Sequence, residues 1–205
     1  MSTLKTGLCS LAIAAAGVGA LAWATHGFQA YTREGLLRLS VQQAPRPLPS
    51  VALQGADGQT AAWPGTRPAG QWIIAGFMYT HCATVCRVQG SEFTQLQALL
   101  QPQIRQGRVR LISISFDPAR DTPAALARYL LRHDAAPGAW DAARPARPGE
   151  LAALLDAFGV QIIPDGLGGF EHNAAFNLID PQGRLAAILD WDDPQAAADY
   201  VLARQ

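Results

Sequence analysis

The chain has 205 residues, which is enough for one globular domain and a short appendage. Hydrophobic residues make up 49% of it, so a packed core can form. The formal net charge is zero, and this argues against a general nucleic-acid-binding protein, which would carry a surplus of basic residues.

The N-terminal segment differs from the rest of the chain. Lys5 precedes a run without charges from Gly7 to Ala24. One interpretation is a membrane anchor, since about 20 apolar residues cross a bilayer. The other is a signal peptide cleaved after Ala24, because residues 22–24 form a small-x-small site. We predict an anchor over residues 1–30, because the run is longer than a typical signal segment. Cys9 lies within this run and is interpreted as an apolar filler.

Residues 31–50 are predicted to form a tether. A short helix is expected to begin with Thr32 as its N-cap, and the prolines of residues 44–50 require an extended chain. The folded domain is predicted to comprise residues 51–205. It begins with a hairpin over residues 51–63, whose turn carries the Asp57-Gly58 signal.

The remaining periodic segments alternate between strands and helices. Residues 71–79 are a nearly continuous apolar run, which is typical of a strand buried on both faces of an α/β sheet. Further elements are expected as a strand at 108–116, a hairpin at 174–180 and 184–191, and helices at 92–101, 121–134, 147–160 and 194–203. This order predicts an α/β protein with a thioredoxin-like arrangement. In that arrangement, the turn after the first central strand leads into the N-terminus of a helix.

Cys82 and Cys86 lie in that turn. They could pack as small apolar side chains, form a redox-active disulfide, or bind a metal. On a regular helix, residues four apart have Cβ atoms about 5–6 Å apart, whereas a disulfide requires about 3.5–4.5 Å. The spacing therefore favours a metal without excluding reversible oxidation.

A metal site with two cysteines requires a third ligand, and the chain has four histidines. His26 lies in the predicted tether, and His81 adjoins Cys82, so its side chain should point elsewhere. His133 is interpreted as a solvated cation at a helix C-terminus. His172 lies in a glycine-rich loop that can reach the cysteine turn, where it is either a ligand or an ordinary loop histidine. Two thiolates and one imidazole suit copper, especially Cu(I), whereas zinc would require a fourth ligand.

Three ordered segments, GFMYTHCATVC, RVRLISISFDPARDTP and EHNAAFNLIDPQGRL, resemble the SCO/SenC family of copper-binding proteins in cytochrome c oxidase assembly. The resemblance covers about residues 40–200. It implies a thioredoxin-like fold with an N-terminal transmembrane helix, attached to the bacterial inner membrane with the domain in the periplasm. It further implies copper, as Cu(I) or Cu(II), bound by Cys82, Cys86 and His172. The implied partner is the CuA site of oxidase subunit II or another cupro-oxidase.

The chain departs from the family pattern at two positions. Arg87 follows the second cysteine, where many members have proline, and Glu171 precedes the histidine, where many have aspartate. Asp117 matches an acidic position near the family's site. It would support the ligands or contact the partner, or it is only a turn residue before Pro118. The helix at 121–134 is expected to be capped by Asp121 or Thr122, with Pro123 in its first turn. The Asp121 carboxylate is therefore interpreted as a helix cap.

The resemblance leaves three functions open. The first is a metallochaperone without enzymatic activity. The second is a membrane-anchored thiol–disulfide oxidoreductase that uses Cys82 and Cys86 as a redox pair to reduce the CuA-site cysteines. The third is a copper or redox sensor that binds a partner without transfer. The spacing of the cysteines and the presence of His172 favour the first.

Overall fold

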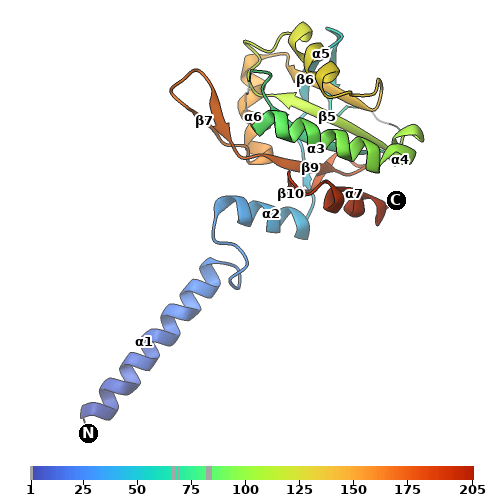
Figure 1. Cartoon of the computed structure of the whole chain (residues 1–205). Helices are drawn as coiled ribbons and strands as arrows, with labels where there is room; N and C mark the ends of the chain where they lie inside the picture. Colours follow the sequence, from blue (N-terminus) through green and yellow to red (C-terminus); the bar gives the residue numbers. More distant parts are fainter. Residues whose placement is uncertain (1, 66–67, 69, 82–84) are drawn as a thin grey trace. The chain divides into compact units, whose positions relative to one another are not determined.

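The computed structural model describes residues 2–65, 68, 70–81 and 85–205, and of residues 2–4 and 85–89 it describes the backbone alone. The chain divides into two compact units, Met1–Gln43 and Ala44–Gln205 (Figure 1). The predicted roles of residues 1–30 as an anchor and of residues 31–50 as a tether stay predictions.

The first unit contains two helices. Helix α1 (Ser2–Ala24) includes a stretch, Lys5–Ala24, that is long and apolar enough to cross a membrane. Helix α2 (Arg33–Gln43) begins as predicted, because the Thr32 hydroxyl accepts a hydrogen bond from the backbone N–H of Gly35 at 2.9 Å.

The second unit is built on an eight-stranded mixed sheet in the order β1-β10-β9-β4-β5-β6-β2-β3. The three central strands β4, β5 and β6 run parallel, and the other neighbours pair antiparallel. The strands are β1 (Arg46–Pro47), β2 (Val51–Gly55), β3 (Thr60–Trp63), β4 (Trp72–Met78), β5 (Val109–Ser115), β6 (Trp140–Pro145), β9 (Ala175–Ile179) and β10 (Arg184–Asp190). Every residue of β4 is buried, as its apolar run predicted.

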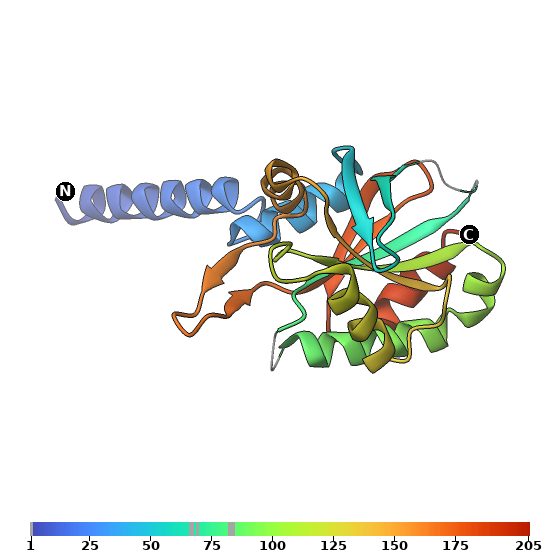
Figure 2. The ribbon, with the colours of Figure 1, turned by 90° about the horizontal axis from the view of Figure 1, so that it is seen from above.

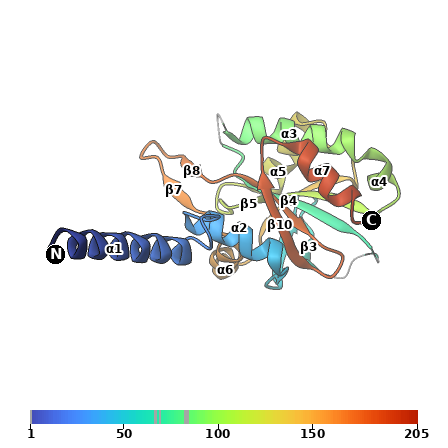
Figure 3. The same ribbon diagram turned by 90° about the horizontal axis from the view of Figure 1, so that it is seen from below.

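Helices cover both faces of this sheet. They are α3 (Val85–Leu99), α4 (Gln101–Arg105), α5 (Pro123–Arg132), α6 (Pro148–Phe158) and α7 (Pro194–Leu202). On one face, Phe93 of α3 stacks on Trp140 at 5.2 Å between ring centroids and meets Phe176 edge-on at 5.4 Å. On the opposite face, Phe158 of α6 packs against Phe77 at 5.1 Å. Figure 3 shows α3 and α6 on opposite sides of the sheet.

The second sheet is small and separate. It consists of β7 (Ile162–Pro164) and β8 (Phe170–His172), which pair antiparallel in the register Ile162↔His172. We call residues 162–172 the His172 hairpin. Figure 2 shows it as the orange pair of strands that projects from the larger sheet.

The structure corrects three sequence-based expectations. Strand β6 was not predicted, because its sequence WDAARP carries charges and no β-branched residues, but it pairs with β5 and β2. The segment before His172 was expected to be a loop and contains the two strands of the hairpin. Helix α3 begins at Val85, inside the cysteine motif, whereas its apolar period predicted a start at residue 92.

Candidate metal centre

The cysteine motif follows the carboxyl end of a central strand. Met78 ends β4 beside Ser115, the last residue of the parallel neighbour β5. The chain then passes through Tyr79, Thr80 and His81. Residues 82–84 lie outside the described part of the chain, and Cys86 is described only as backbone in the first turn of α3. The predicted geometry of the cysteine pair therefore stays a prediction.

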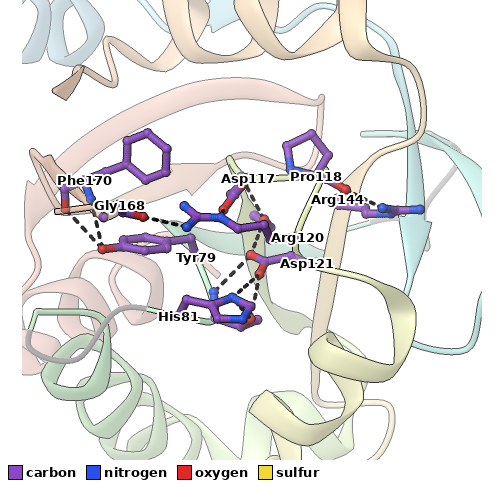
Figure 4. Close-up of polar contacts among 12 residues, drawn as sticks. Tyr79, His81, Asp117, Pro118, Arg120, Asp121, Arg144, Gly168 and Phe170 are labelled. Atoms are coloured by element: carbon purple, nitrogen blue, oxygen red, sulfur yellow. Dashed lines mark hydrogen bonds and ion pairs between the residues drawn. The ribbon is translucent and has the colours of Figure 1, made fainter. Parts of the chain in front are cut away.

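A buried carboxylate holds the segment that enters the motif. The side chain of Asp121 is inaccessible to solvent. Its Oδ2 accepts hydrogen bonds from the Thr80 backbone N–H at 3.0 Å and the Ser115 hydroxyl at 2.5 Å, and its Oδ1 accepts one from the Thr80 hydroxyl at 2.6 Å. His81 Nδ1 lies 3.6 Å from the same Oδ1 (Figure 4). Asp121 thus joins the end of β4 to the end of β5.

This role replaces the predicted one for Asp121. Of the two caps expected for helix α5, Thr122 is the one observed, and its hydroxyl accepts a hydrogen bond from the backbone N–H of Ala125 at 3.3 Å. Pro123 occupies the first helical position, as expected. The side chain of Asp121 is consequently directed at the cysteine segment and takes no part in the cap.

Asp117, the predicted acidic neighbour of the site, forms an ion pair with Arg120. Arg120 Nε donates to Asp117 Oδ2, and Arg120 Nη1 donates to the carbonyl oxygen of Gly168 at 2.6 Å (Figure 4). The guanidinium carbon also lies 5.2 Å from the ring centroid of Phe170 and 5.9 Å from that of Tyr79. One side chain therefore connects the turn after β5 to the His172 hairpin.

His172 is the last residue of β8 and is half-buried. Its ring meets the ring of Phe116 edge-on, with 4.9 Å between centroids. Burial lowers the pKa of the His172 imidazole below its usual value, and a hydrogen bond with the backbone of Asn173 opposes this shift. The neutral imidazole, which is the form that binds a metal, is thereby favoured.

The hairpin is attached to the rest of the domain at two further points. The Tyr79 hydroxyl accepts a hydrogen bond from the Phe170 backbone N–H at 3.1 Å. At the base of the hairpin, Asn173 Oδ1 accepts from the Gln161 backbone N–H at 2.7 Å, and its Nδ2 donates to the Gly159 carbonyl at 3.0 Å. The hairpin that carries His172 is thus held both by its own base and by the residue three positions before Cys82.

The other described histidines do not join this group, except for His81 beside Asp121. His133 was expected to be a solvated cation, but its ring packs on the Tyr129 ring, with 4.7 Å between ring centroids, and lies against Gly90 of α3. His26 lies in the first unit, with a positive φ of 50°. Among the residues that the structure describes, no three His, Cys, Asp or Glu side chains are grouped to hold a metal. The ligand set of Cys82, Cys86 and His172 accordingly stays a prediction.

Sequence reasoning missed Tyr79, Arg120 and Phe170 as neighbours of the site. Their contacts join positions 48 and 91 residues apart, so no local period or cap signal marks them. The only local signal was the alternation of charges in the segment DPARD, where Arg120 lies between two carboxylates.

Comparisons with known proteins place this geometry in context. The family model of SCO1/SenC matches residues 52–204. A SCO1 protein homolog from Bacillus subtilis is 27% identical over 134 residues, which cover 64% of this chain and 67% of that protein. A protein from Stutzerimonas stutzeri described as copper-binding is 30% identical over 120 residues, or 57% of this chain and 56% of that one.

Solved structures agree with the predicted thioredoxin-like α/β fold. Bradyrhizobium japonicum ScoI with copper bound has a TM-score of 0.64 and 25% identity, and the match covers 78% of this chain and 99% of that one. Yeast Sco1 with copper bound has a TM-score of 0.64 at 20% identity, covering 78% and 88%. With most of the second unit matched by the family model, the chain belongs to the SCO1/SenC family.

Proposed function

We propose that this protein is a metallochaperone in cytochrome c oxidase assembly that carries one copper ion as cargo, bound by Cys82, Cys86 and His172. The observation that supports it best is the hydrogen bond between Phe170 and Tyr79. It joins the strand of the histidine to the segment that enters the cysteine motif, although the two lie 91 residues apart in sequence. Two soft thiolates and a neutral imidazole form a donor set suited to Cu(I).

The proposed acceptor is the CuA site of oxidase subunit II or another cupro-oxidase. Residues 1–30 would anchor the protein in the bacterial inner membrane, residues 31–50 would act as a tether, and the domain of residues 51–205 would work in the periplasm. The apolar stretch Lys5–Ala24 of α1 supports the anchor. An anchored carrier would meet a membrane-bound oxidase by diffusion in two dimensions.

A second function is favoured by the position of Cys86 in the first turn of α3. A helix N-terminus stabilises a thiolate, which is the nucleophile of disulfide exchange. In this alternative, the reduced pair attacks a disulfide of the CuA apoprotein. The partner gains two thiols, and Cys82 and Cys86 become a disulfide, so that two electrons and two protons are transferred.

The first experiment is a Cu(I) titration of the purified full chain, in detergent, with its cysteines reduced or oxidised. We expect one copper per chain in the reduced protein and none in the oxidised protein, because a disulfide consumes both sulfur ligands. Undiminished binding by the oxidised protein would rule out this site.

The second experiment separates carrier from reductase with His172→Ala. Loss of a ligand should weaken Cu(I) binding by more than the roughly 10- to 100-fold typical of outer-sphere changes. Disulfide exchange with an oxidised CuA apoprotein should be nearly unchanged. An unchanged Cu(I) affinity combined with slower exchange would contradict the metallochaperone and favour the oxidoreductase.

A further inference from the structure

We propose that Arg120 is a positioning residue that holds the His172 hairpin against the end of β5, and that Asp117 acts through Arg120. This inference rests on the proposed copper site. It assigns a function to a residue of the DPARD segment whose described contacts are with Asp117, the Gly168 carbonyl and the rings of Tyr79 and Phe170.

The His172 hairpin needs such support. Its two strands have three residues each and, among the residues that the structure describes, pair with each other alone. An isolated two-stranded hairpin is at best marginally stable in water. Its base is fixed by Asn173, but the tip at Gly168 lies at the far end from that anchor. The orientation of the strand that ends at His172 therefore depends on contacts along its length.

Arg120 provides the contact at the tip. Its guanidinium donates to the carbonyl of Gly168 at 2.6 Å and at the same time to the carboxylate of Asp117. Asp117 is itself fixed, because its backbone N–H donates to the Ser115 hydroxyl at 3.0 Å and its side chain is about nine-tenths buried. The guanidinium is planar and its donors form a rigid fork, so it can hold two acceptors in one geometry.

The same side chain acts on the aromatic residues beside His172. The guanidinium carbon lies 5.2 Å from the centroid of the Phe170 ring, within the range of a cation–π contact. The Phe170 ring in turn lies edge-on to Phe116 at 5.8 Å, and Phe116 contacts the His172 ring. Loss of the Arg120 side chain would therefore remove both the hydrogen bond to the hairpin tip at Gly168 and the cation–π contact with Phe170.

Arg144 is a matched control on the opposite side of the same turn (Figure 4). Its Nη1 donates to the carbonyl of Pro118, and its Nε and Nη2 donate to Gln54 Oε1 at 3.0 and 2.8 Å. Arg144→Ala removes an arginine that supports residues 117–121 without removing a contact to the hairpin. Any difference between the two alanine variants therefore reports the link to the hairpin.

The first test uses the copper-free full chain in detergent and measures amide hydrogen exchange over residues 162–172. We expect faster exchange in Arg120→Ala, with β4 and β5 unchanged, and exchange like that of the wild type in Arg144→Ala. Equal exchange in the wild type and Arg120→Ala would overturn the proposal. This readout does not depend on whether copper binds.

The second test measures Cu(I) affinity in a double-mutant cycle. Arg120→Ala should weaken binding about 10- to 100-fold, which is typical of groups that orient a ligand. It should have no further effect in a His172→Ala background, because the residue acts through His172. An equal loss in both backgrounds would overturn the positioning role. Arg120→Lys keeps the positive charge but lacks the planar fork of donors. A Cu(I) affinity as low as that of Arg120→Ala would support the role of the fork. A Cu(I) affinity like that of the wild type would contradict it.

The two proposals fail in different ways. If His172→Ala binds Cu(I) as tightly as the wild type, the proposed ligand set is wrong, and hydrogen exchange alone decides the role of Arg120. If His172→Ala loses affinity while Arg120→Ala does not, the metal site stands and the positioning role is wrong.

Discussion

The buried carboxylate of Asp121 accepts hydrogen bonds from both the backbone N–H and the hydroxyl of Thr80, at 3.0 and 2.6 Å. Thr80 lies two residues before Cys82. The turn after β5 thus contacts both parts of the proposed site: Asp121 holds the entry to the cysteine motif, and Asp117, through Arg120, contacts the His172 hairpin.

Asp121→Asn should lower the free energy of unfolding by about 1–3 kcal/mol, the usual cost of leaving a buried polar group unsatisfied. In the described part of the chain, the groups that hydrogen-bond to the carboxylate, which are the N–H and hydroxyl of Thr80 and the Ser115 hydroxyl, are all donors. An amide NH₂ in this place would face a donor. Urea denaturation of the reduced, copper-free chain measures the change, and wild-type stability would contradict the assigned contacts.

Gly90→Ala should be destabilising by about 1–3 kcal/mol, as expected for overpacking. A Cβ at Gly90 would lie 2.2 Å from Cε1 of the His133 ring, which is itself packed against Tyr129. The control is Gly149→Ala in α6, where a Cβ would meet nothing within 4 Å. Thermal unfolding should show a lower midpoint temperature for Gly90→Ala and an unchanged one for Gly149→Ala.

The same clash can be tested by removing its other side. In a His133→Ala background the ring is absent, so Gly90→Ala should cost much less than it does alone. Equal costs in both backgrounds would show that the glycine is required for another reason.

Glu92→Gln should change how stability depends on pH. Burial raises the pKa of Glu92, repulsion from Asp192 raises it further, and a hydrogen bond with Gln95 opposes the shift. Because the folded-state pKa lies above the unfolded value, Glu92 contributes stability at low pH that is lost as the pH rises through the folded-state pKa. The variant should therefore gain stability relative to the wild type at neutral pH, by at most about 0.5 kcal/mol, the usual range of a surface substitution.

Urea midpoints at pH 4 and pH 7 measure this effect. Asp192→Asn should give part of the same gain, because it removes the same repulsion, and it should add little to Glu92→Gln. A gain that is larger at pH 4 than at pH 7 would have the wrong sign and would contradict this account.

The native protein should stay in the membrane fraction after an alkaline wash, and deletion of residues 1–30 should release it. The reason is the apolar stretch Lys5–Ala24, which matches the length needed to cross a bilayer. N-terminal sequencing of the native protein decides between the two interpretations of this segment. A mature protein that begins at Thr25 would establish a cleaved signal and refute the anchor.

The central part of the fold could be predicted from local patterns. The apolar run before the cysteines is β4, and the turn signal Asp57-Gly58 joins β2 to β3, where Asp57 Oδ1 accepts from the Gln59 backbone N–H at 2.9 Å. Such elements are specified by neighbours in sequence. Strand β6 could not be predicted in this way, because its stability comes from pairing with β5 and β2 on its two sides.

The sequence alone suggests a chemistry for the candidate site, which stays a prediction, but it does not reveal the contacts that hold the site's segments in place. The residue types at positions 82, 86 and 172 indicate a metal or a redox pair, since thiolates and imidazoles are recognisable from sequence. The contacts of Asp121 and Arg120 depend on the parallel pairing of β4 with β5 and on the path of the hairpin, which no local pattern contains. The sequence therefore favoured a helix cap for Asp121, the nearest local interpretation.

The separate pairing of β7 with β8 has a consequence for how this family can diversify. A substitution on the outer side of the hairpin cannot shift the register of any strand in the eight-stranded sheet. Ile163 and Leu167 are 59% and 93% exposed there, close in sequence to His172. Substitutions can thus change the surface close to His172 while the interior of the domain stays constant. We expect members of the family to diverge most at these outer positions and least within β4 and β5.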